Sequence, residues 1–566
     1  MNNYFISYLR GFRGLLKQLD KKIKCFHRCC SSLDGVEKKS DDEKNVIRNS
    51  TEILQFKNDH VAKYVLDCMS KYSSSIALIN GETDERLTFS ELERKILKTA
   101  NILLRLGLKK GDVVTLFSPN SINYPVVVFA ATLIGASCSP VNYLYNADEL
   151  VKLVSQVEPS TVFTTRQLVA TVNQILPQCP YIKRVLLIDS DSDIFVEQNS
   201  QSPIADVRNV DICTEDVAVL PFSSGTTGVP KAVQLTHSNL VYNLQQALNP
   251  DRLDFRNGDR ILSVLPYFHI FGYMANMMGC MVTGATQVIM SRFNPEVFLK
   301  CLDQYQCSYL TAVPPMVLFM CRHPLAVSTT FPNVRAIVTG AAPTPVSLIE
   351  EIRKKLKAGA IVKQAYGLTE TSPAVCIGLN SNPKDDSVGP VIPHTELKVL
   401  DANDQILPRQ QNGEICVRGP QIMKGYYKND ADNEQTFTKD GWLRTGDIGS
   451  VDEKDFVYLF DRSKELIKVK GFQVAPAELE SILLSHPLVA DTAVIGVPDD
   501  QLGEKPRAYV VLKKTDSVKA QELVQFVEGK VAAFKRLTGG VEFVQEIPKS
   551  QTGKILRRVL KEKLLS

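Results

Sequence analysis

Short apolar runs alternate with amphipathic stretches along most of the chain, starting near residue 50. Thr88 and Glu91 have the spacing of a helical capping box. Leu92 and Ile96 would share one apolar face of that helix, and Gly107 suits its C-terminal cap. Apolar runs predict strands at residues 113–117, 161–164, 185–188 and 217–222. Because strands that alternate with helices are usually parallel and covered by those helices, the pattern predicts an α/β fold.

The pattern changes towards the C-terminus. Residues 413–419 and 456–460 are typical of strands separated by turns, which predicts a β-rich part. Beyond Asp461, helices are expected at 477–484 and 518–531, and strands at 492–497 and 508–513. About a hundred residues is an ordinary size for a small domain of this α+β kind. We therefore expect a large domain over residues 49–460, with parallel α/β subdomains and a β-rich subdomain, followed by a small domain over residues 461–566.

Two long uncharged runs, residues 113–146 and 261–291, resemble membrane spans in their hydropathy. Pro119 and Pro140 interrupt the first run, and Pro266 interrupts the second. Buried strands and helices of a globular core explain such interrupted runs better than spans do. We expect no transmembrane helix.

Composition narrows the function classes. A chain of 566 residues exceeds what one hydrophobic core usually organises, so more than one domain is expected. The net charge is +4, but residues 1–30 hold seven Lys or Arg and one Asp. The rest of the chain has 59 basic and 61 acidic residues, which argues against a nucleic-acid partner. Thirteen cysteines without paired spacings favour a reducing intracellular compartment.

Residues 1–48 form a predicted basic N-terminal extension. Apolar side chains recur at helical spacing from Phe5 to Phe26, with Lys and Arg between them. Three interpretations stay open: peripheral membrane contact through residues 4–30, a mitochondrial presequence, and a dispensable extension. The C-terminal Lys-Leu-Leu-Ser differs from the Ser-Lys-Leu peroxisomal signal. The sequence therefore leaves the cytosol, the mitochondrion and the peroxisome open.

A hydroxyl-rich and glycine-rich loop follows the strand expected to end at Phe222. It reads Ser223-Ser224-Gly225-Thr226-Thr227-Gly228-Val229-Pro230-Lys231. The glycines let the backbone approach phosphate oxygens, the hydroxyls donate hydrogen bonds and Lys231 supplies positive charge. The loop is not a Walker A motif, because Pro230 stands where that motif needs Gly and Ala232 where it needs Ser or Thr. A flexible turn is the alternative to a phosphate loop when this segment is taken alone.

Seven segments in order, this loop included, resemble the adenylate-forming (ANL) superfamily and, within it, the acyl-CoA synthetases and 4-coumarate-CoA ligases. The other six segments are 265–272 (LPYFHIFG), 338–343 (VTGAAP), 364–370 (QAYGLTE), 442–447 (WLRTGD), 461–473 (DRSKELIKVKGFQ) and 548–558 (PKSQTGKILRR). The resemblance runs from about residue 50 to the end of the chain. One departure lies in the phosphate loop, where Ala232 replaces the usual Gly.

The resemblance implies a role for each matching residue. Lys554, His269, Lys231 and Glu370 would be catalytic, and Glu370 would hold the metal. The nucleotide would contact Ser223, Ser224, Gly225, Thr226, Thr227, Gly228, Lys231, Gln364, Ala365, Tyr366, Thr369, Asp447, Arg462, Lys464, Lys468 and Lys554. The acyl group would contact His269, Phe271, Ala341, Ala365 and Gly367. CoA would contact Lys470, Gly471 and Gln473.

The implied activity is that of an acid:CoA ligase that uses ATP, Mg²⁺ and CoA. A small carboxylic acid would attack the α-phosphorus of ATP, with cations stabilising the transition state and the pyrophosphate that leaves. The family then rotates its small, mobile domain about a hinge, here near Asp461, so that Lys554 leaves and CoA reacts with the acyl-adenylate. His269 near pH 7 would be neutral or cationic.

Two departures from the family concern the substrate. Ala365 stands where many relatives have Gly, so its methyl group should narrow the acyl pocket. Phe271 replaces a Tyr of coumarate-specific members, which removes a hydroxyl that could bind a phenol. Both departures argue against strict 4-coumarate specificity. Aryl and fatty acids stay open as substrates, because an apolar pocket discriminates between acids of neighbouring chain length by only about 1–3 kcal/mol.

Three other functions stay open at this point. A luciferase-like monooxygenase shares these motifs, but its members have paired histidines where this chain has Phe268-His269. A stand-alone adenylating module would load a separate carrier protein. A binding protein would keep the fold without turnover, against which Lys231, Glu370 and Lys554 speak.

Overall fold

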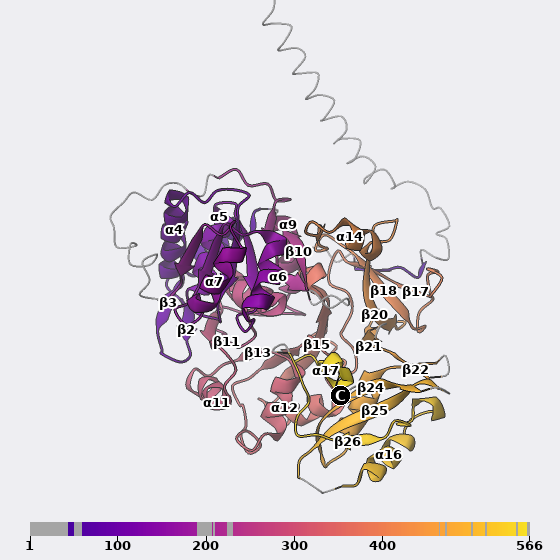
Figure 1. Ribbon diagram of the computed structural model, residues 1–566. Helices are drawn as coiled ribbons and strands as arrows, with labels where there is room; N and C mark the ends of the chain where they lie inside the picture. Colours follow the sequence, from indigo (N-terminus) through magenta and orange to yellow (C-terminus); the bar gives the residue numbers. More distant parts are fainter. Residues whose placement is uncertain are drawn as a thin grey trace, which may run out of the picture. The chain divides into compact units, whose positions relative to one another are not determined.

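The computed structural model describes residues 44–49, 59–189, 207, 210–223, 230–462, 465–469, 472–499, 502–514, 518–550 and 553–562. The chain divides into two units, residues 1–45 and 46–566, and Figure 1 labels the helices and strands of the second. The helix expected between Phe5 and Phe26 lies outside the described residues. Strand β1 (Ile47–Arg48) pairs with β17 (Glu396–Leu400), so these two residues belong to the second unit. The predicted domain limits remain a prediction.

The first sheet has the order β19-β10-β8-β5-β4-β6-β7, with β9 paired to β10. Its strands are β4 (Val113–Phe117), β5 (Ser137–Val141), β6 (Thr161–Thr164), β7 (Arg184–Leu187), β8 (Val217–Val219), β9 (Phe222–Ser223), β10 (Lys231–Thr236) and β19 (Gly425–Tyr426). The pairs from β8 to β7 are parallel, whereas β10 is antiparallel to its neighbours. The associated helices are α4 (Phe89–Arg105), α5 (Tyr124–Leu133), α6 (Ala147–Val157), α7 (Val169–Ile175) and the 3₁₀ turn η2 (Leu176–Gln178).

The second sheet has the order β16-β15-β14-β13-β11-β12-β2-β3. Its strands are β2 (Ile76–Asn80), β3 (Arg86–Thr88), β11 (Arg260–Ser263), β12 (Thr286–Ile289), β13 (Tyr309–Ala312), β14 (Ala336–Thr339), β15 (Ile361–Gly367) and β16 (Ala374–Ile377). Its helical elements are α3 (Val61–Met69), η1 (Ser70–Tyr72), α9 (His237–Ala247), the π-helix η5 (Gly272–Met278), α10 (Gly279–Thr283), α11 (Pro295–Gln304), α12 (Pro314–Arg322), α13 (Val346–Arg353) and η6 (Thr369–Thr371). The six strands from β15 to β2 are parallel.

The main hydrophobic core lies between these two sheets. One cluster joins residues of α3, α4, α5 and α9 to residues of both sheets. A second cluster packs α6 and α7 against the other face of the first sheet, and a third packs α11, α12 and α13 against the second sheet. Helices thus cover parallel strands on both faces, which confirms the predicted α/β class.

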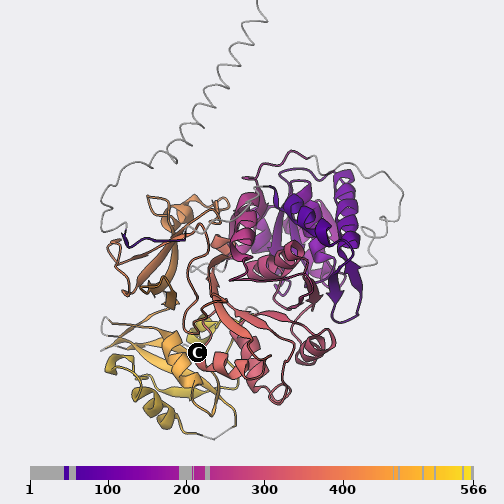
Figure 2. The ribbon, with the colours of Figure 1, turned by 180° about the vertical axis from the view of Figure 1, so that it is seen from behind.

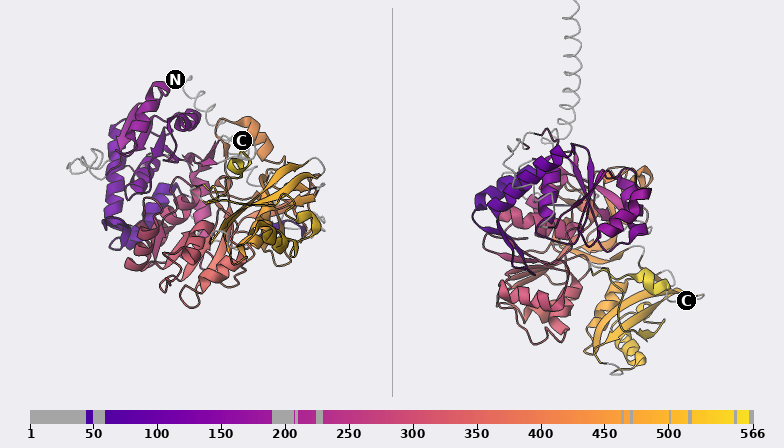
Figure 3. Two further views of the ribbon diagram at one scale, coloured as in Figure 1. Left: turned by 60° about the horizontal axis from the view of Figure 1, so that its bottom comes forward. Right: turned by 60° about the vertical axis from the view of Figure 1, so that its left-hand side comes forward.

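Two further sheets follow in the chain. The first, of order β1-β17-β18-β20-β21, is antiparallel and adds β18 (Gly413–Arg418), β20 (Leu443–Val451), β21 (Val457–Arg462) and helix α14 (Asp430–Thr436). The second contains β22 (Ile467–Val469), β23 (Phe472–Val474), β24 (Val489–Asp499), β25 (Gly503–Leu512) and β26 (Val541–Phe543). Its helical elements are α15 (Pro476–Leu484), α16 (Ala520–Glu528), η7 (Ala533–Lys535) and α17 (Arg557–Glu562). This C-terminal part has its own core, and Figures 2 and 3 show it in orange to yellow.

Local sequence signals set several of these elements. The Thr88 hydroxyl accepts a 3.2 Å hydrogen bond from the Glu91 amide, and the Glu91 carboxylate accepts a 2.8 Å bond from the Thr88 amide, so the capping box is confirmed. The single strand expected over residues 217–222 is wrong, since β8 ends at Val219 and β9 begins at Phe222. Pro221 lies at the break, because a residue without an N–H cannot continue the ladder.

The two uncharged runs contain strands and short helices. Residues 113–146 hold β4, α5 and β5, and residues 261–291 hold η5, α10 and β12 after most of β11. Within the described part of the chain, the helices fall short of the length and apolarity that crossing a bilayer demands.

Candidate active site

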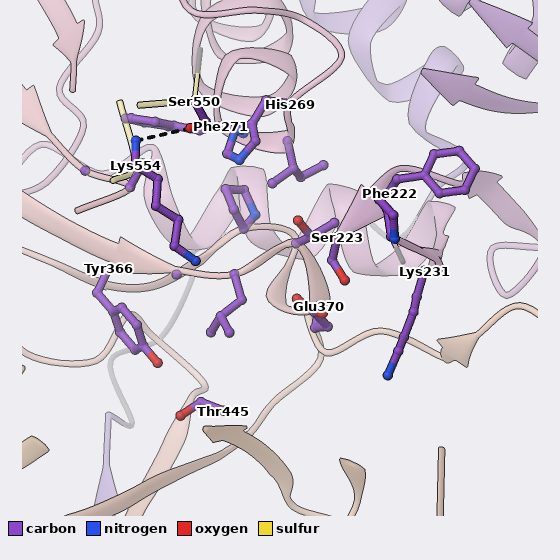
Figure 4. A pocket seen from close by; sticks show the side chains of 18 of the residues that line it. Phe222, Ser223, Lys231, His269, Phe271, Tyr366, Glu370, Thr445, Ser550 and Lys554 are labelled. Carbon is purple, nitrogen blue, oxygen red and sulfur yellow. Dashed lines mark hydrogen bonds between the residues drawn. The ribbon is translucent and has the colours of Figure 1, made fainter. Parts of the chain in front are cut away.

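A cavity of about 1230 Å³ lies where the first three sheets meet the C-terminal part of the chain (Figure 4). The predicted site residues that line it are Ser223, Lys231, His269, Phe271, Ala341, Ala365, Tyr366, Gly367, Thr369, Glu370 and Lys554. They come from segments spread over more than three hundred positions of the chain. The fold therefore brings residues that are distant in the sequence to the wall of one cavity.

Other predicted residues lie elsewhere. Gln364, Asp447 and Lys468 are described but do not line the cavity. Outside the described residues lie Ser224, Gly225, Thr226, Thr227, Gly228, Lys464, Lys470 and Gly471. Arg462 ends β21 and Gln473 lies in β23, and the structure describes their backbone alone.

Strand β15 positions Glu370. A Cβ atom on Gly367 would overlap the carbonyl oxygen of Pro373, so the chain can turn out of the strand there only with glycine. The turn η6 follows and buries the Glu370 side chain at the cavity wall. The hydroxyl of Tyr426 donates a 2.9 Å hydrogen bond to Glu370 Oε1. The carboxylate is thus held in one orientation.

Gln364 and Asp447 join the elements that carry the cavity wall through hydrogen bonds. The Gln364 amide accepts a 2.9 Å hydrogen bond from the Thr344 backbone N–H and donates one of 2.7 Å to the Asp385 carbonyl. It therefore fixes the loop after β14 against β15. Asp447 Oδ2 accepts a 2.7 Å hydrogen bond from the hydroxyl of Tyr366, which ties β20 to β15. Burial and the neighbouring Asp447 raise the pKa of Tyr366 well above its usual value.

Lys231 is the last residue of the hydroxyl-rich loop of the sequence motif and begins β10. Its Nζ atom lies 2.8 Å from Asp432 Oδ1 and 5.0 Å from the ring centroid of Tyr426. Asp432 and Tyr426 line the cavity too, and the sequence analysis missed both. Asp432 gave no functional signal, because an acid in the first turn after the N-cap Asn429 is an ordinary feature of a helix start. Lys231 thus stands between an acidic and an aromatic partner.

His269 lies at the start of the turn that leads into the π-helix η5. The backbone N–H of Phe271 donates a 3.3 Å hydrogen bond to His269 Nδ1. Burial lowers the pKa of His269 to about 4, so the ring is neutral at pH 7. Because Nδ1 accepts a hydrogen bond, the ring proton of the neutral form lies on Nε2. His269 can therefore donate a hydrogen bond from Nε2.

One end of the cavity is apolar. It begins at Phe271, Gly340 and Ala365, which we call the constriction. They lie so close together that a Cβ atom on Gly340 would lie 3.3 Å from Phe271 Cε1 and 3.3 Å from the Ala365 carbonyl oxygen. The further lining residues belong to one hydrophobic cluster: Ala247, Leu248, Leu253, Val338, Ala374 and Ile377. Asn243 lies beside them, but its amide donates to and accepts from the backbone of Ala374. This end therefore suits an uncharged, apolar group.

Lys554 lies on a tight loop in the C-terminal part of the chain. The Lys554 amide donates a 3.1 Å hydrogen bond to the Ser550 hydroxyl, and the Ser550 amide donates a 2.8 Å bond to the Lys554 carbonyl (Figure 4). Gly553 has a φ of 76°, and a Cβ atom there would lie 2.7 Å from Pro315 Cδ at the start of α12. The loop thus reaches the cavity through a close backbone contact that glycine permits.

Comparison with known proteins identifies the class. The model of the AMP-binding enzyme family matches residues 67–427, and the model of the AMP-binding enzyme C-terminal domain matches residues 478–554. The chain therefore belongs to the AMP-binding enzyme family, and its structural neighbours are acyl-CoA synthetases of the ANL superfamily. Within that family it is an AMP-forming acid-thiol ligase that resembles the 4-coumarate-CoA ligases. The monooxygenase and carrier-loading alternatives gain no support from these relatives.

Individual relatives agree with this assignment. 4-Coumarate-CoA ligase 1 of Narcissus pseudonarcissus is 36% identical over 522 residues, which cover 89% of this chain and 94% of the relative. The probable 4-coumarate-CoA ligase 3 of Dictyostelium discoideum is 35% identical over 507 residues, covering 86% and 92%. ATP-bound MatB from Rhodopseudomonas palustris has a TM-score of 0.80 at 26% identity, covering 89% of this chain and 98% of its own. The o-succinylbenzoate-CoA synthetase MenE of Bacillus subtilis, in complex with the acyl-adenylate intermediate OSB-AMP, has a TM-score of 0.76 at 28% identity, covering 89% and 98%.

Proposed function

We propose that the enzyme activates a carboxylic acid with an apolar aryl or fatty acyl tail, first as an acyl-adenylate and then as a CoA thioester. The observation that carries this proposal is that the predicted groups of several motifs line one cavity. Its lining includes Lys231, Lys554, the carboxylate of Glu370 and the neutral imidazole of His269, and its apolar end lies beyond Phe271. The acid, the triphosphate and the thiol would all be processed there.

In the first step, a carboxylate oxygen attacks the α-phosphorus of ATP. A new oxygen–phosphorus bond forms, the bond to the β-phosphate oxygen breaks, and pyrophosphate leaves. Lys554 and Lys231 supply positive charge for the developing negative charge. The Nε2–H of His269 donates a hydrogen bond to the acid carboxylate and orients it beside the constriction.

Mg²⁺ is implied by the family, and the residues present fit it. Among the residues described, no group of three or more His, Cys, Asp or Glu side chains could cage a metal ion. Mg²⁺ usually keeps several waters and binds through one or two carboxylates together with substrate phosphates. Glu370, held by Tyr426, provides one such carboxylate at the cavity wall. Bound there with ATP, the ion would neutralise phosphate charge.

In the second step, the CoA sulfur attacks the acyl carbonyl carbon and a carbon–sulfur bond forms, while the thiol proton passes to solvent. The bond between that carbon and the phosphate oxygen breaks, and AMP leaves with its electron pair. Rotation of the C-terminal part near Asp461 would withdraw Lys554 and admit the thiol, with Lys470, Gly471 and Gln473 contacting CoA. Such a rotation excludes water from a hydrolysable mixed anhydride. Because burial lowers the pKa of His269 to about 4, its imidazole would carry no charge beside the acyl-adenylate at pH 7.

The apolar end of the cavity supports the proposed substrate class. A second carboxylate on the acid would be buried against Leu253, Val338 and Ile377, where the described lining residues carry no charge, and an unpaired buried charge is costly. Phe271 offers no hydroxyl to a phenol at the constriction. Uncharged apolar tails therefore fit best.

A substrate panel tests the proposal. Purified enzyme with ATP and Mg²⁺ is given aryl acids, fatty acids of graded length and dicarboxylic acids, and pyrophosphate, AMP and thioester are measured with and without CoA. We expect AMP and thioester in equal amounts with apolar monocarboxylic acids. A preference for dicarboxylic acids would contradict the substrate class, and pyrophosphate release without thioester in the presence of CoA would contradict the ligase reaction.

A further inference from the structure

We propose that Arg557 is a positioning residue for Lys554. Its side chain joins three elements of the C-terminal part and thereby fixes the loop that carries the lysine. This inference rests on the proposed function, since it assumes that Lys554 acts in the adenylation step and not in thioester formation.

The contacts of Arg557 are unusually complete. Its Nη1 atom lies 2.6 Å from Glu465 Oε2, and Nη2 lies 2.8 and 3.0 Å from the two Glu480 oxygens. Its Nε–H donates a 3.2 Å hydrogen bond to the carbonyl of Val494. The side chain is 13% exposed and that of Glu480 is 10% exposed. All three guanidinium nitrogens are thus engaged by the protein, although the residue borders the cavity.

These partners lie on separate elements. Glu465 is four residues beyond Asp461, where the hinge is predicted; Glu480 lies on α15 and Val494 on β24. Glu480 Oε1 also accepts a 2.8 Å hydrogen bond from the Val494 amide, which locks helix and strand to each other. An arginine suits this place because its planar fork binds several acceptors at once, which a lysine cannot do.

The lysine loop is held at both ends. On its N-terminal side, Lys549 Nζ lies 2.6 Å from Asp491 of β24. On its C-terminal side, the Leu556 amide donates a 2.9 Å hydrogen bond to the Pro548 carbonyl, and Arg557 follows directly. Without Arg557, the C-terminal end of the loop would lose its link to α15 and to Glu465. The Lys554 ammonium would then spread over many positions, and misplacement of a catalytic group by about 1 Å can cost about 100-fold in rate.

The test measures the two half-reactions separately for Arg557→Gln and Glu465→Gln. Adenylation is followed as pyrophosphate release from ATP and an acid that the enzyme accepts, and thioester formation is followed from a supplied acyl-adenylate and CoA. We expect each variant to slow adenylation at least 10-fold and to keep thioester formation within threefold of wild type. Adenylation by the double variant should be no slower than by Arg557→Gln alone, because the two substitutions disrupt the same ion pair.

Arg507→Gln is the matched control. Arg507 of β25 also pairs with a carboxylate, Glu542 at 3.8 Å, and a carbonyl, Gly539 at 3.0 Å, but it does not line the cavity. We expect both half-reactions to stay within threefold of wild type. Arg557→Lys, which keeps the charge, should recover only part of the adenylation rate.

Three outcomes overturn the inference: unchanged adenylation, an equal loss in both half-reactions, or full rescue by Arg557→Lys. If Arg557→Gln does not fold, as judged by circular dichroism, Glu465→Gln and Arg557→Lys decide the question. Lys554→Ala in the same assays separates this inference from the proposed function. If Lys554→Ala still adenylates rapidly, the function proposed for that lysine is contradicted. If Lys554→Ala loses adenylation but the Arg557 variants adenylate at the wild-type rate, this inference alone is contradicted.

Discussion

The hydroxyl of Tyr426 donates a 2.9 Å hydrogen bond to the carboxylate of Glu370, and the ring of the same tyrosine lies 5.0 Å from Lys231 Nζ. One side chain of β19 therefore contacts both the proposed metal ligand and the proposed phosphate-binding lysine. This relationship joins the two charged parts of the site, and neither motif of the sequence contains it.

Tyr426→Phe should weaken the use of MgATP. A hydrogen bond to a charged group contributes about 1.5–3 kcal/mol, so its loss should raise the KM for MgATP about 10-fold or more. Titration of Mg²⁺ and ATP in the adenylation assay measures this effect. Tyr427→Phe, which removes a neighbouring hydroxyl that does not line the cavity, serves as control. An unchanged KM in Tyr426→Phe would show that the hydrogen bond does not orient Glu370.

Gly340→Ala should narrow the constriction of the apolar end. The new Cβ atom would lie 3.3 Å from Phe271 Cε1, so the phenyl ring would have to move into the space of the acyl tail. We expect kcat/KM for the bulkiest accepted acid to fall about 10-fold or more, within the range that steric selection in apolar pockets reaches. The smallest accepted acid should lose less than threefold. Equal losses for both acids would contradict the placement of the constriction.

Gly553→Ala should slow adenylation through its contact with Pro315. Alanine at a φ of 76° costs about 1–2 kcal/mol, and its Cβ atom would also lie 2.7 Å from Pro315 Cδ. Gly540→Ala is the matched control, because Gly540 has a φ of 79° and no atom within 4 Å of the added Cβ. We expect a loss of adenylation in Gly553→Ala alone. Equal rates in the two variants would refute a role for the contact.

His237 should make the enzyme less stable in mild acid. Burial, with a smaller contribution from His60, lowers the pKa of His237 to about 3, while the unfolded value is 6.5. The unfolded chain therefore binds more protons between pH 3 and 6.5, and the free energy of unfolding falls as the pH drops below 6.5. His237 alone should contribute about 2 kcal/mol to this loss at pH 5 relative to pH 8.

Denaturant unfolding at pH 8 and pH 5 checks this expectation against His237→Asn. The asparagine oxygen can still accept the hydrogen bond that the Val61 amide donates to His237 Nδ1. The variant should lose less free energy between the two pH values than wild type. An identical loss would mean that His237 is already accessible to protons in the folded state.

The sequence predicted much of the fold because its signals are local. The capping box of Thr88 and Glu91, the parallel α/β order and the small C-terminal part all follow from spacing and periodicity. His269, Glu370 and Lys554, which the family motifs singled out, line one cavity. These features depend on residues close in sequence or on a family pattern.

What the sequence did not predict depends on contacts between distant strands. The pairing of β10 with β19 places Tyr426 and Asp432 beside Lys231, and nothing near residue 430 indicates it. Gln364 belongs to a segment that resembles a nucleotide-binding motif. Because side chains alternate along β15, the Gln364 side chain contacts Thr344 and Asp385, whereas Ala365 lines the cavity. Such orientations follow from sheet register.

Lys554→Ala, assayed separately in the two half-reactions, tests the central claim most directly. If the lysine of the C-terminal loop stabilises the transition state of adenylation, pyrophosphate release should fall about 100-fold or more, as loss of a charge-stabilising donor usually costs. Thioester formation from a supplied acyl-adenylate and CoA should stay within threefold of wild type. Adenylation at the wild-type rate, or a matching loss in thioester formation, would contradict the account.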